Sequence, residues 1–412
     1  MNRKLSQISI ALSCASISLF YAPLSFASPQ LKEKLDKIID QAISDKTIVG
    51  TVLVVKRDGK TVYKRAAGLA NKENNLKVKE NEMFRLASMT KPLVAACALK
   101  MAEEGIFNLD EPITKWLPYF TPKTADGKTP VITMRQLLTH TSGLGYVFME
   151  EVEGPYHKAK VTDGLAQDGV SQEENLKRLA SVPLLFEPGA AWHYSLGIDV
   201  VGAAIEKATG KSLLEAIKSR ISGPLAMKDL TFTVSKEQAK RLAVPYFNTP
   251  SGPQKMADKQ LVPFSKSGFT ICPAQAFNSA CYQSGGSGMI DTASDYSNFL
   301  ETMRLGGNKF QNLDMLSNKV GNYTISMGPG WGFGFTGAVL KDPAAAKTPQ
   351  GAGTVQWGGA TGNQWFVDPV NKISVVSLTN TTTAGMQGPY PNALRDAIYE
   401  SIAQEETKKV SR

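Results

Sequence analysis

Phe84-Arg85-Leu86-Ala87-Ser88-Met89-Thr90-Lys91 is the stretch that decides the fold, and it contains the only Ser-x-x-Lys of the chain. A helical pattern of apolar residues starts here and runs to about residue 104. On a helix, Ser88 and Lys91 lie one turn apart, so their side chains can meet. A serine hydroxyl becomes an effective nucleophile when a neighbouring base accepts its proton, and a buried lysine can be that base. The stretch therefore predicts nucleophilic catalysis by Ser88, activated by Lys91.

Two observations weaken this interpretation when the stretch is taken alone. The same pattern fits a serine that caps a surface helix and is followed by a solvated lysine. In addition, Pro92 follows Lys91 directly, and a residue before proline is disfavoured in the helical conformation. The rest of the chain has to supply the support.

The two ends of the chain have matching patterns. Residues 30–44 have helical spacing, and two β-rich runs follow, 50–56 and 61–68, joined across Asp58-Gly59. Near the other end, strand patterns at 331–338, 352–358, 363–368 and 373–379 precede a helical stretch at about 391–404. Between the ends, helical patterns occupy 88–104, 133–139, 172–180, 196–209, 212–221 and 293–304.

This arrangement predicts an α+β fold. One antiparallel sheet is built from both chain ends and flanked by the terminal helices, and it carries a large helical insertion. The α/β part covers about 28–87 and 325–412, and the helical part covers about 88–324. An active site is expected at the seam between the two parts.

The N-terminus is typical of a cleavable secretory signal. Arg3 and Lys4 precede an apolar stretch from Ile8 to Leu24, and the small residues of Ser25-Phe26-Ala27 follow. Serines dilute the apolar stretch, which is shorter than a membrane span requires, so we expect cleavage after residue 27 and no stable span afterwards. A mature protein of residues 28–412 is then periplasmic or secreted. Its formal charge falls from +9 to +7 and is spread along the chain, which argues against nucleic-acid binding.

Three cysteines remain after cleavage of the signal. An exported protein meets an oxidising compartment, so Cys272 and Cys281 are predicted to form a disulfide that closes a short loop. Cys97 lies in an apolar run and is expected to be a buried, unreactive side chain. The three histidines, His140, His157 and His193, are not grouped with cysteines or carboxylates at metal-ligand spacing, so no metal and no cofactor is expected.

Further motifs follow the nucleophile stretch in a fixed order. They are Leu109-Asp110-Glu111-Pro112, Met134-Arg135-Gln136-Leu137-Leu138-Thr139-His140-Thr141-Ser142-Gly143-Leu144, Glu187-Pro188-Gly189 before Tyr194-Ser195, and Gly285-Gly286-Ser287-Gly288-Met289 before Thr292-Ala293-Ser294-Asp295-Tyr296. Their order and separations, from about residue 31 to 400, resemble those of the class C β-lactamase, DD-peptidase and family VIII carboxylesterase group. The resemblance implies a β-lactamase/transpeptidase-like fold. Ser-x-Thr-Lys-Pro is common in that group, which answers the objection raised by Pro92.

The resemblance also gives Tyr194 a role. The second motif of the group is Tyr-x-Asn, whose tyrosine relays a proton between the serine, the leaving group and water. Here Tyr194-Ser195-Leu196 occupies that place, so Tyr194 is implied as the third catalytic residue. Leu196 replaces an asparagine that would help to hold a β-lactam, which makes the chain more similar to the esterases. His193, the neighbour of Tyr194, is given no role by the family pattern.

The third motif departs from the lactamase and peptidase pattern. There a Lys-Thr-Gly or His-x-Gly strand carries a cation that meets the substrate carboxylate, whereas this chain has Val355-Gln356-Trp357-Gly358-Gly359-Ala360. Trp357 offers one N–H donor and an apolar face, so an anionic substrate would lose charge-assisted hydrogen bonds of about 1.5 to 3 kcal/mol each. Gly358 and Gly359 let the backbone approach a ligand closely. By resemblance, the N–H groups of Ser88 and Ala360 form the oxyanion hole.

A literal Lys-Ser-Gly also exists, at Lys266-Ser267-Gly268. It precedes the motifs at 285–296, whereas the family's strand follows them, so it is the weaker candidate. The glycine-flanked serine of an α/β-hydrolase is absent.

The function expected from these residues is hydrolysis of small carboxylic esters through an acyl-serine, without a cofactor. Two alternatives stay open. A β-lactamase or a DD-peptidase acting on cell-wall peptides would keep Ser88, Lys91 and Tyr194 but would have to accommodate Leu196 and Trp357. A non-catalytic sensor or scaffold of the same fold would be expected to have lost one of the three side chains. The sequence gives no indication of the oligomeric state.

Overall fold

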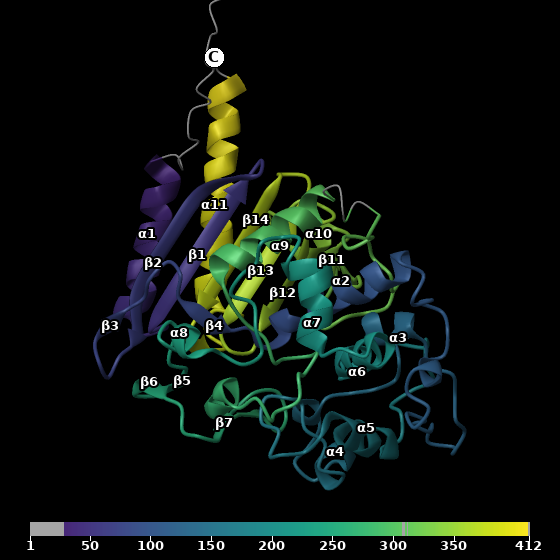
Figure 1. Cartoon of the computed structure of the whole chain (residues 1–412). Helices are drawn as coiled ribbons and strands as arrows, with labels where there is room; N and C mark the ends of the chain where they lie inside the picture. Colours follow the sequence, from purple (N-terminus) through teal and green to yellow (C-terminus); the bar gives the residue numbers. More distant parts are fainter. Residues whose placement is uncertain (1–28, 307–309, 311, 411–412) are drawn as a thin grey trace, which may run out of the picture.

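The computed structural model describes residues 29–306, 310 and 312–410 (Figure 1). The predicted signal peptide, residues 1–27, lies outside the described residues. The central element is an eight-stranded sheet in the order β10-β11-β12-β13-β14-β1-β2-β3. Its strands are β1 (Gly50–Arg57), β2 (Lys60–Asn71), β3 (Leu76–Lys77), β10 (Trp331–Phe333), β11 (Ala338–Leu340), β12 (Val355–Gly359), β13 (Asn363–Asp368) and β14 (Ile373–Thr379).

The two ends of the chain meet in the middle of this sheet. β1 pairs with β14 in antiparallel register from Thr51 opposite Thr379 to Arg57 opposite Ile373. β1 also pairs with β2 in the hairpin that turns at Asp58-Gly59. The predicted antiparallel sheet made from both chain ends is confirmed.

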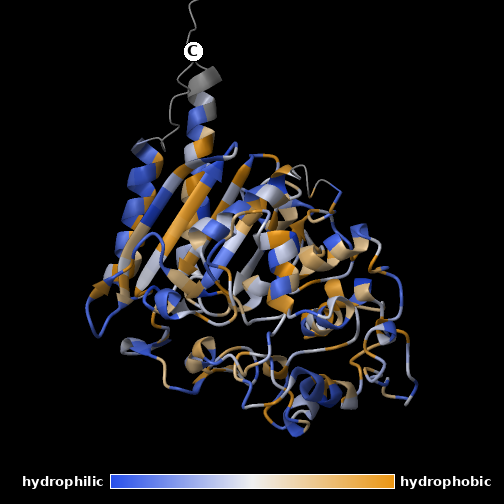
Figure 2. Ribbon diagram, in the orientation of Figure 1, coloured by the Kyte–Doolittle hydropathy of each residue, from blue (hydrophilic) through white to orange (hydrophobic). Residues whose placement is uncertain are grey.

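Different helices cover the two faces of the sheet. The terminal helices α1 (Pro29–Ser44) and α11 (Pro389–Val410) pack side by side on one face, over alternate strand residues such as Leu53 and Val55. The residues that alternate with these along β1, Val52 and Val54, face a second and larger core on the other side. Figure 2 shows the apolar β1 in orange and the surface of α1 largely in blue.

The second face carries the central part of the chain. Helix α9 (Ala293–Leu305) lies against β1, β13 and β14, and Tyr296 of this helix contacts Trp365 of β13. The other helices are α2 (Thr90–Glu103), α3 (Met134–Leu138), α4 (Pro155–Lys158), α5 (Gln172–Ser181), α6 (Gly197–Thr209), α7 (Leu213–Ile217), α8 (Lys236–Ala239) and α10 (Pro343–Ala346).

Short strands connect this central part to the sheet. β4 (Met83–Arg85) pairs with β9 (Ile290–Thr292), and β5 (Tyr246–Thr249) joins β6 (Gly252–Lys255) and β15 (Thr381–Thr382). A separate hairpin is formed by β7 (Gln260–Val262) and β8 (Phe269–Ile271). The sequence patterns did not predict these small sheets.

One predicted strand is wrong. The run 331–338 is divided into β10 and the start of β11, because the chain makes a tight turn in which the Gly334 N–H donates to the Gly337 carbonyl at 2.8 Å. The proposed division of the chain at about residues 88 and 325 stays a prediction.

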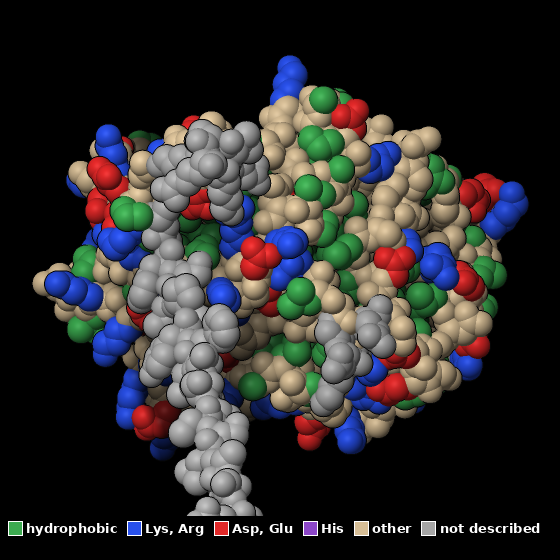
Figure 3. Space-filling view, turned by 90° about the horizontal axis from the view of Figure 1, so that it is seen from above, with side chains coloured by type: hydrophobic (Ala, Val, Ile, Leu, Met, Phe, Trp, Pro, Cys, Tyr) green, Lys and Arg blue, Asp and Glu red, His purple; other side chains and the backbone are tan. Residues whose placement is uncertain are grey.

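Two properties of the described residues bear on the setting of the protein. None of their helices is long and apolar enough to cross a membrane. On the face seen in Figure 3, Lys and Arg side chains are interspersed with Asp and Glu, and the hydrophobic side chains are scattered among them.

Candidate active site

The predicted nucleophile lies where a short turn enters α2. A 3₁₀ turn, Ala87–Met89, runs directly into the helix, and the Lys91 Nζ lies 3.1 Å from the Ser88 hydroxyl oxygen. Pro92 is the third residue of α2, where a proline is tolerated because the first N–H groups of a helix have no intrahelical partner. The backbone before the serine is strained, since Ala87 has a φ of 44°. The structure thus brings Ser88 and Lys91 together.

Three groups surround the Lys91 amine. It donates to the Gly286 carbonyl at 2.7 Å, and it lies 5.2 Å and 4.8 Å from the ring centres of Tyr146 and Tyr194. Only 5% of Lys91 is exposed. This enclosure fixes the amine beside the serine.

Two buried carboxyl groups, Asp199 and Asp163, interact electrostatically with Lys91. Asp199 on α6 accepts from the Ser284 hydroxyl at 2.6 Å, and the lack of a Cβ at Gly286 makes room for its second oxygen. Burial raises the pKa of Asp199, although that hydrogen bond and the charge of Lys91 oppose the rise. Burial also raises the pKa of Asp163 to about 6.

Tyr194 lies between the lysine and the third motif. Its hydroxyl accepts from the Trp357 indole N–H at 3.3 Å, and its ring stacks on Tyr146 with 5.0 Å between centres. The structure therefore brings Tyr194 and Trp357 together beside Lys91. Leu196 is fully buried at the start of α6, so the position of the family's asparagine offers no polar group.

The segment after Tyr194 is held by a buried histidine. The Ser195 N–H donates to the His140 Nδ1 at 3.2 Å, so the ring proton is on Nε2. Burial lowers the pKa of His140 well below its usual value, and the charge of Lys91 adds to this effect. His140 is accordingly a neutral, structural residue. His193, which the family pattern left without a role, donates its backbone N–H to the His140 carbonyl.

Strand β12 approaches the nucleophile turn from the other side. A Cβ on Gly359 would lie 2.1 Å from the Leu86 carbonyl oxygen, so only glycine allows this contact. Both Ser88 and Ala360, the residue after β12, line the same cavity. The two-donor oxyanion hole stays a prediction that this arrangement favours.

A cavity of about 710 Å³ opens in front of these residues. Its walls are largely aromatic and apolar and include Tyr146, Phe148, Leu165, Tyr194, Phe264, Phe269, Met327, Trp331 and Trp357, with Gly358, Asp163 and Ser287 among the remaining lining residues. A cavity of this size accommodates a small organic molecule.

The competing Lys-Ser-Gly motif lies at the tip of the β7–β8 hairpin. The side chain of Lys266 is 57% exposed and pairs with Glu151 at 3.6 Å. It does not line the cavity, so it does not replace the cation that Trp357 displaces.

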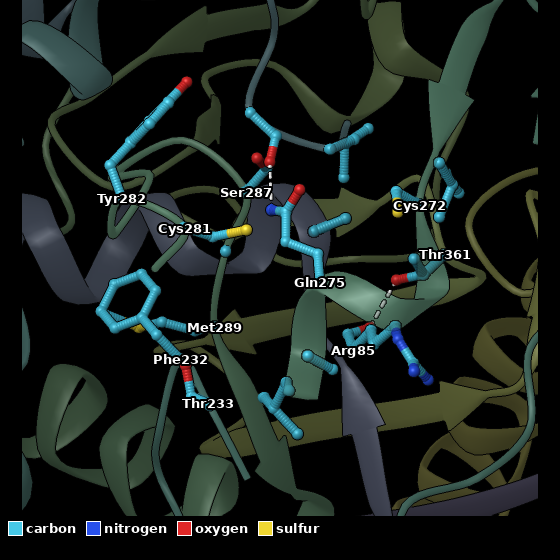
Figure 4. A pocket seen from close by; sticks show the side chains of 17 residues that line it. Arg85, Phe232, Thr233, Cys272, Gln275, Cys281, Tyr282, Ser287, Met289 and Thr361 are labelled. Carbon is cyan, nitrogen blue, oxygen red and sulfur yellow. Dashed lines mark hydrogen bonds between the residues drawn. The ribbon is translucent and has the colours of Figure 1, made fainter. Parts of the chain in front are cut away.

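The predicted disulfide is not formed. Cys272 and Cys281 are both free thiols, as is the buried Cys97. The two sulfurs lie apart around a small cavity of about 40 Å³, with Gln275 between them (Figure 4). Gln275 is held there because its side chain donates to the Gly164 carbonyl at 2.7 Å.

Sequence reasoning missed several residues of the site. Tyr146, Asp163 and Asp199 carry no motif spacing of their own and become neighbours of Lys91 only through the fold. Gly286 belongs to the glycine-rich motif 285–289, and this motif was the one feature of the sequence that indicated a part of the site near Lys91. Among the described residues no group of three or more His, Cys, Asp or Glu side chains could hold a metal ion.

Comparisons with known proteins agree with this geometry. The family model described as beta-lactamase matches residues 35–400. Esterase EstB of Burkholderia gladioli is 43% identical over 388 residues, which are 93% of this chain and 98% of that protein. The solved structure of EstCE1, described as a hydrolase with promiscuous acyltransferase activity, superposes with a TM-score of 0.85 at 38% identity and covers 90% of this chain and 98% of its own. The D-alanyl-D-alanine-carboxypeptidase/endopeptidase AmpH of Escherichia coli is 29% identical over 57% of this chain and 59% of its own. The chain therefore belongs to the beta-lactamase family.

Proposed function

We propose that the protein is a serine carboxylesterase that hydrolyses uncharged esters through an acyl-Ser88 intermediate. The observation that carries the proposal is the position of Trp357. It stands where lactamases and peptidases of the family have a cation, and its N–H is directed at the Tyr194 hydroxyl. The similarity to EstB and EstCE1 over most of the chain supports the same assignment.

The mechanism uses the three side chains in two half-reactions. As the Ser88 oxygen attacks the ester carbonyl, Lys91 and the Tyr194 hydroxyl take its proton, and Tyr194 passes a proton to the departing alcohol. The N–H groups of Ser88 and Ala360 stabilise the oxyanion. Water then attacks the acyl-enzyme with the same pair as base, which releases the acid and restores the serine.

The hydrogen bonds of Lys91 suit this role. A neutral amine has two protons and one lone pair. Lys91 donates to the Gly286 carbonyl at 2.7 Å and to the Ser88 hydroxyl oxygen at 3.1 Å. In the neutral amine the lone pair takes the place of the proton directed at Ser88, and it can then accept the Ser88 proton.

The first test compares the mature protein with Ser88→Ala on p-nitrophenyl butyrate and on the cephalosporin nitrocefin. We expect rapid butyrate hydrolysis that falls roughly 10³-fold or more in the variant, little nitrocefin turnover, and an acyl adduct on Ser88 by intact-mass analysis. Faster nitrocefin than butyrate turnover would favour a β-lactamase. Activity on neither substrate, with no adduct, would favour the non-catalytic scaffold.

Two further variants test the assisting residues. Lys91→Ala removes the amine and Tyr194→Phe removes the relay hydroxyl, so kcat on p-nitrophenyl butyrate is expected to fall by about 10²-fold or more in each. Circular dichroism serves as the control for folding. Near-normal rates in either variant would contradict the assignment.

We also propose that the protein is exported and that the mature chain begins at Ser28. Support comes from the charged, apolar and small-residue segments of the first 27 residues. N-terminal sequencing of protein recovered from periplasmic and culture-medium fractions tests this. An intact Met1 on cytoplasmic protein would contradict it.

A further inference from the structure

The tip of the β7–β8 hairpin is hydrogen-bonded to the segment Val147-Phe148, and Phe148 lines the cavity in front of Ser88. The N–H groups of Lys266 and Ser267 both donate to the Phe148 carbonyl, at 3.2 and 3.4 Å. The Ser267 hydroxyl donates to the Val147 carbonyl at 3.1 Å. Since its only proton is used there, His157 Nε2, at 3.0 Å, is the donor to the same hydroxyl. Ser267 thus connects the hairpin to the segment that follows Tyr146.

This attachment assembles three phenylalanines. Phe148, Phe264 and Phe269 lie edge to face, with ring centres 5.5 to 6.2 Å apart, and we call them the aromatic wall. All three line the cavity that contains Ser88. The wall continues to the catalytic tyrosine, because Tyr146 stacks on Phe148 at 4.9 Å and on Tyr194 at 5.0 Å.

The position of Tyr194 gives the cavity a direction. Tyr194 protonates the departing alcohol, and its hydroxyl is bonded to the Trp357 indole, so the alcohol leaves on the Trp357 side. Ala360, the expected second oxyanion donor, packs instead against the cluster that contains Phe264 and Phe269. With its carbonyl oxygen at that donor and its alcohol on the Trp357 side, an ester has its acyl group as the remaining substituent, and we place this group against the aromatic wall, which lines the same cavity.

The charges at this end of the cavity exclude an acidic acyl group. Asp163 lines the cavity two residues before Leu165, which packs with the aromatic wall. The cation of the hairpin tip, Lys266, is turned to solvent and pairs with Glu151. A carboxylate on the acyl group would meet Asp163 at this end of the cavity, whereas the cation that lines the cavity, Arg395, lies on α11.

We propose that the aromatic wall binds the acyl group of the substrate and selects uncharged aromatic or branched acyl groups, with Ser267 as a positioning residue for the wall. This proposal rests on the esterase function above. In it, Phe264 contacts the substrate, whereas Ser267 acts through Phe148 and Phe264.

The test uses two substrate series on the mature full-length protein. In the acyl series, p-nitrophenol is fixed and the acid is acetate, butyrate or phenylacetate. In the alcohol series, butyrate is fixed and the alcohol is methanol, benzyl alcohol or p-nitrophenol. Values of kcat/KM are compared within each series, so that a general loss of activity cancels.

Phe264→Ala is expected to lower the phenylacetate-to-acetate ratio of kcat/KM about 10- to 100-fold and to leave the ratios of the alcohol series unchanged. Phe148→Ala provides a second variant with the same expectation. Phe277→Ala, which truncates a phenylalanine that is 56% exposed and outside the cavity, is the matched control and should leave both series unchanged.

Ser267→Ala is expected to raise KM for p-nitrophenyl phenylacetate about tenfold with little change in kcat, because the wall is displaced while the catalytic side chains stay in place. Ser267→Thr keeps the hydroxyl and should restore the KM. A purely structural role would lower stability without this dependence on the acyl group.

Different results would overturn different claims. If Phe264→Ala and Phe148→Ala change the alcohol series, or both series equally, the acyl assignment of the wall is wrong while the esterase function stands. If the unaltered protein shows no Ser88-dependent ester turnover, the proposed function fails, and this proposal fails with it.

Discussion

The indole of Trp357 makes the contact that distinguishes this site from one built around a cation. Its N–H donates to the Tyr194 hydroxyl at 3.3 Å, so it orients the proton relay as well as occupying space. In Trp357→Phe the ring contact stays and this hydrogen bond is lost. Since one such bond contributes about 1 kcal/mol, kcat/KM for p-nitrophenyl butyrate is expected to fall about three- to tenfold.

Wild-type protein, Trp357→Phe and Trp357→Lys can be compared on both p-nitrophenyl butyrate and nitrocefin. Trp357→Lys restores the cation of the lactamases, so it should lose ester turnover more strongly than Trp357→Phe. An unchanged rate in Trp357→Phe would mean that the indole N–H has no part in the relay.

The buried carboxyl of Asp163 makes stability depend on pH. Its pKa is raised from the ordinary value of 3.8 to about 6, so the folded state binds the proton more tightly than the unfolded state. This contribution to stability is complete below about pH 4 and is lost as the pH rises through about 6. Asp163→Asn has no such loss. The free energy of unfolding of the variant, relative to that of the wild type, should therefore rise between pH 4.5 and pH 8, by about 3 kcal/mol at most.

Thermal unfolding at both pH values measures this difference. Asp258→Asn, at an exposed aspartate, is the control and should follow the wild type. A constant difference between Asp163→Asn and the wild type across the pH range would show that the folded and unfolded states bind this proton equally, so that folding does not raise the pKa of Asp163.

At the scale of residues, motifs predicted Ser88, Lys91, Tyr194 and Trp357, which the fold brings together, because the proposed chemistry fixes their spacing or their neighbours. Asp163 could not be found in this way. Its role depends on burial beside Lys91, and nothing in the local sequence of an aspartate records how deeply it is buried. The Cys272–Cys281 disulfide was wrong for a related reason, since the short spacing said nothing about Gln275 between the two sulfurs.

Strand β12 and the nucleophile turn are in backbone contact, and the contact can be tested at Gly359. A Cβ there would meet the Leu86 carbonyl at 2.1 Å, and because backbone cannot yield as a side chain can, the strand would have to move away from Ser88. Gly359→Ala is expected to keep its fold and to lose about 10²-fold in kcat on p-nitrophenyl butyrate, as is common for small displacements of catalytic groups.

Gly358→Ala provides the comparison on the same strand. The new methyl group there would meet the flexible Met386 side chain at 2.7 Å, which can turn aside, so a smaller loss is expected. Equal losses in the two variants would show that contact with the turn is not what Gly359 provides.

At the scale of elements, the long helices and the paired strands were predictable because their apolar periodicity extends over many residues. Helices α1, α6 and α9 begin and end close to their predicted limits. The hairpin of β7 and β8 was missed, since its strands have three residues each and lie in a stretch rich in proline, glycine and serine. The hairpin is held in place by hydrogen bonds to Val147 and Phe148, which are distant in sequence.

The two largest hydrophobic cores of the described residues lie on opposite faces of the sheet, and the larger one contains Tyr194 and Met89, the neighbour of Ser88. Leu35 on α1 is fully buried in the smaller core. Leu35→Ala is expected to lower the free energy of unfolding by about 2 to 5 kcal/mol and to leave kcat on p-nitrophenyl butyrate unchanged. Urea unfolding and steady-state kinetics measure the two quantities. A parallel loss of kcat would show that the cores are coupled across the sheet.

The overall architecture was predictable from two features of the sequence, the apolar patterns at its two ends and the order of its motifs. The patterns at the two ends indicated strands and helices that need other strands and helices to pack against. The order of the motifs indicated a family in which the strands from both ends form one sheet. The small sheets were not predictable, because pairs such as β4 with β9 join segments about two hundred residues apart and carry no matching pattern.

The pairing of β1 with β14 also determines when the molecule becomes active. Thr51 and Thr379 are neighbours, so the sheet closes only after almost the entire polypeptide has been synthesised. Ser88 and Lys91 come early in the chain, whereas β12 comes near its end. A chain truncated before β14 is therefore expected to lack both the closed sheet and esterase activity.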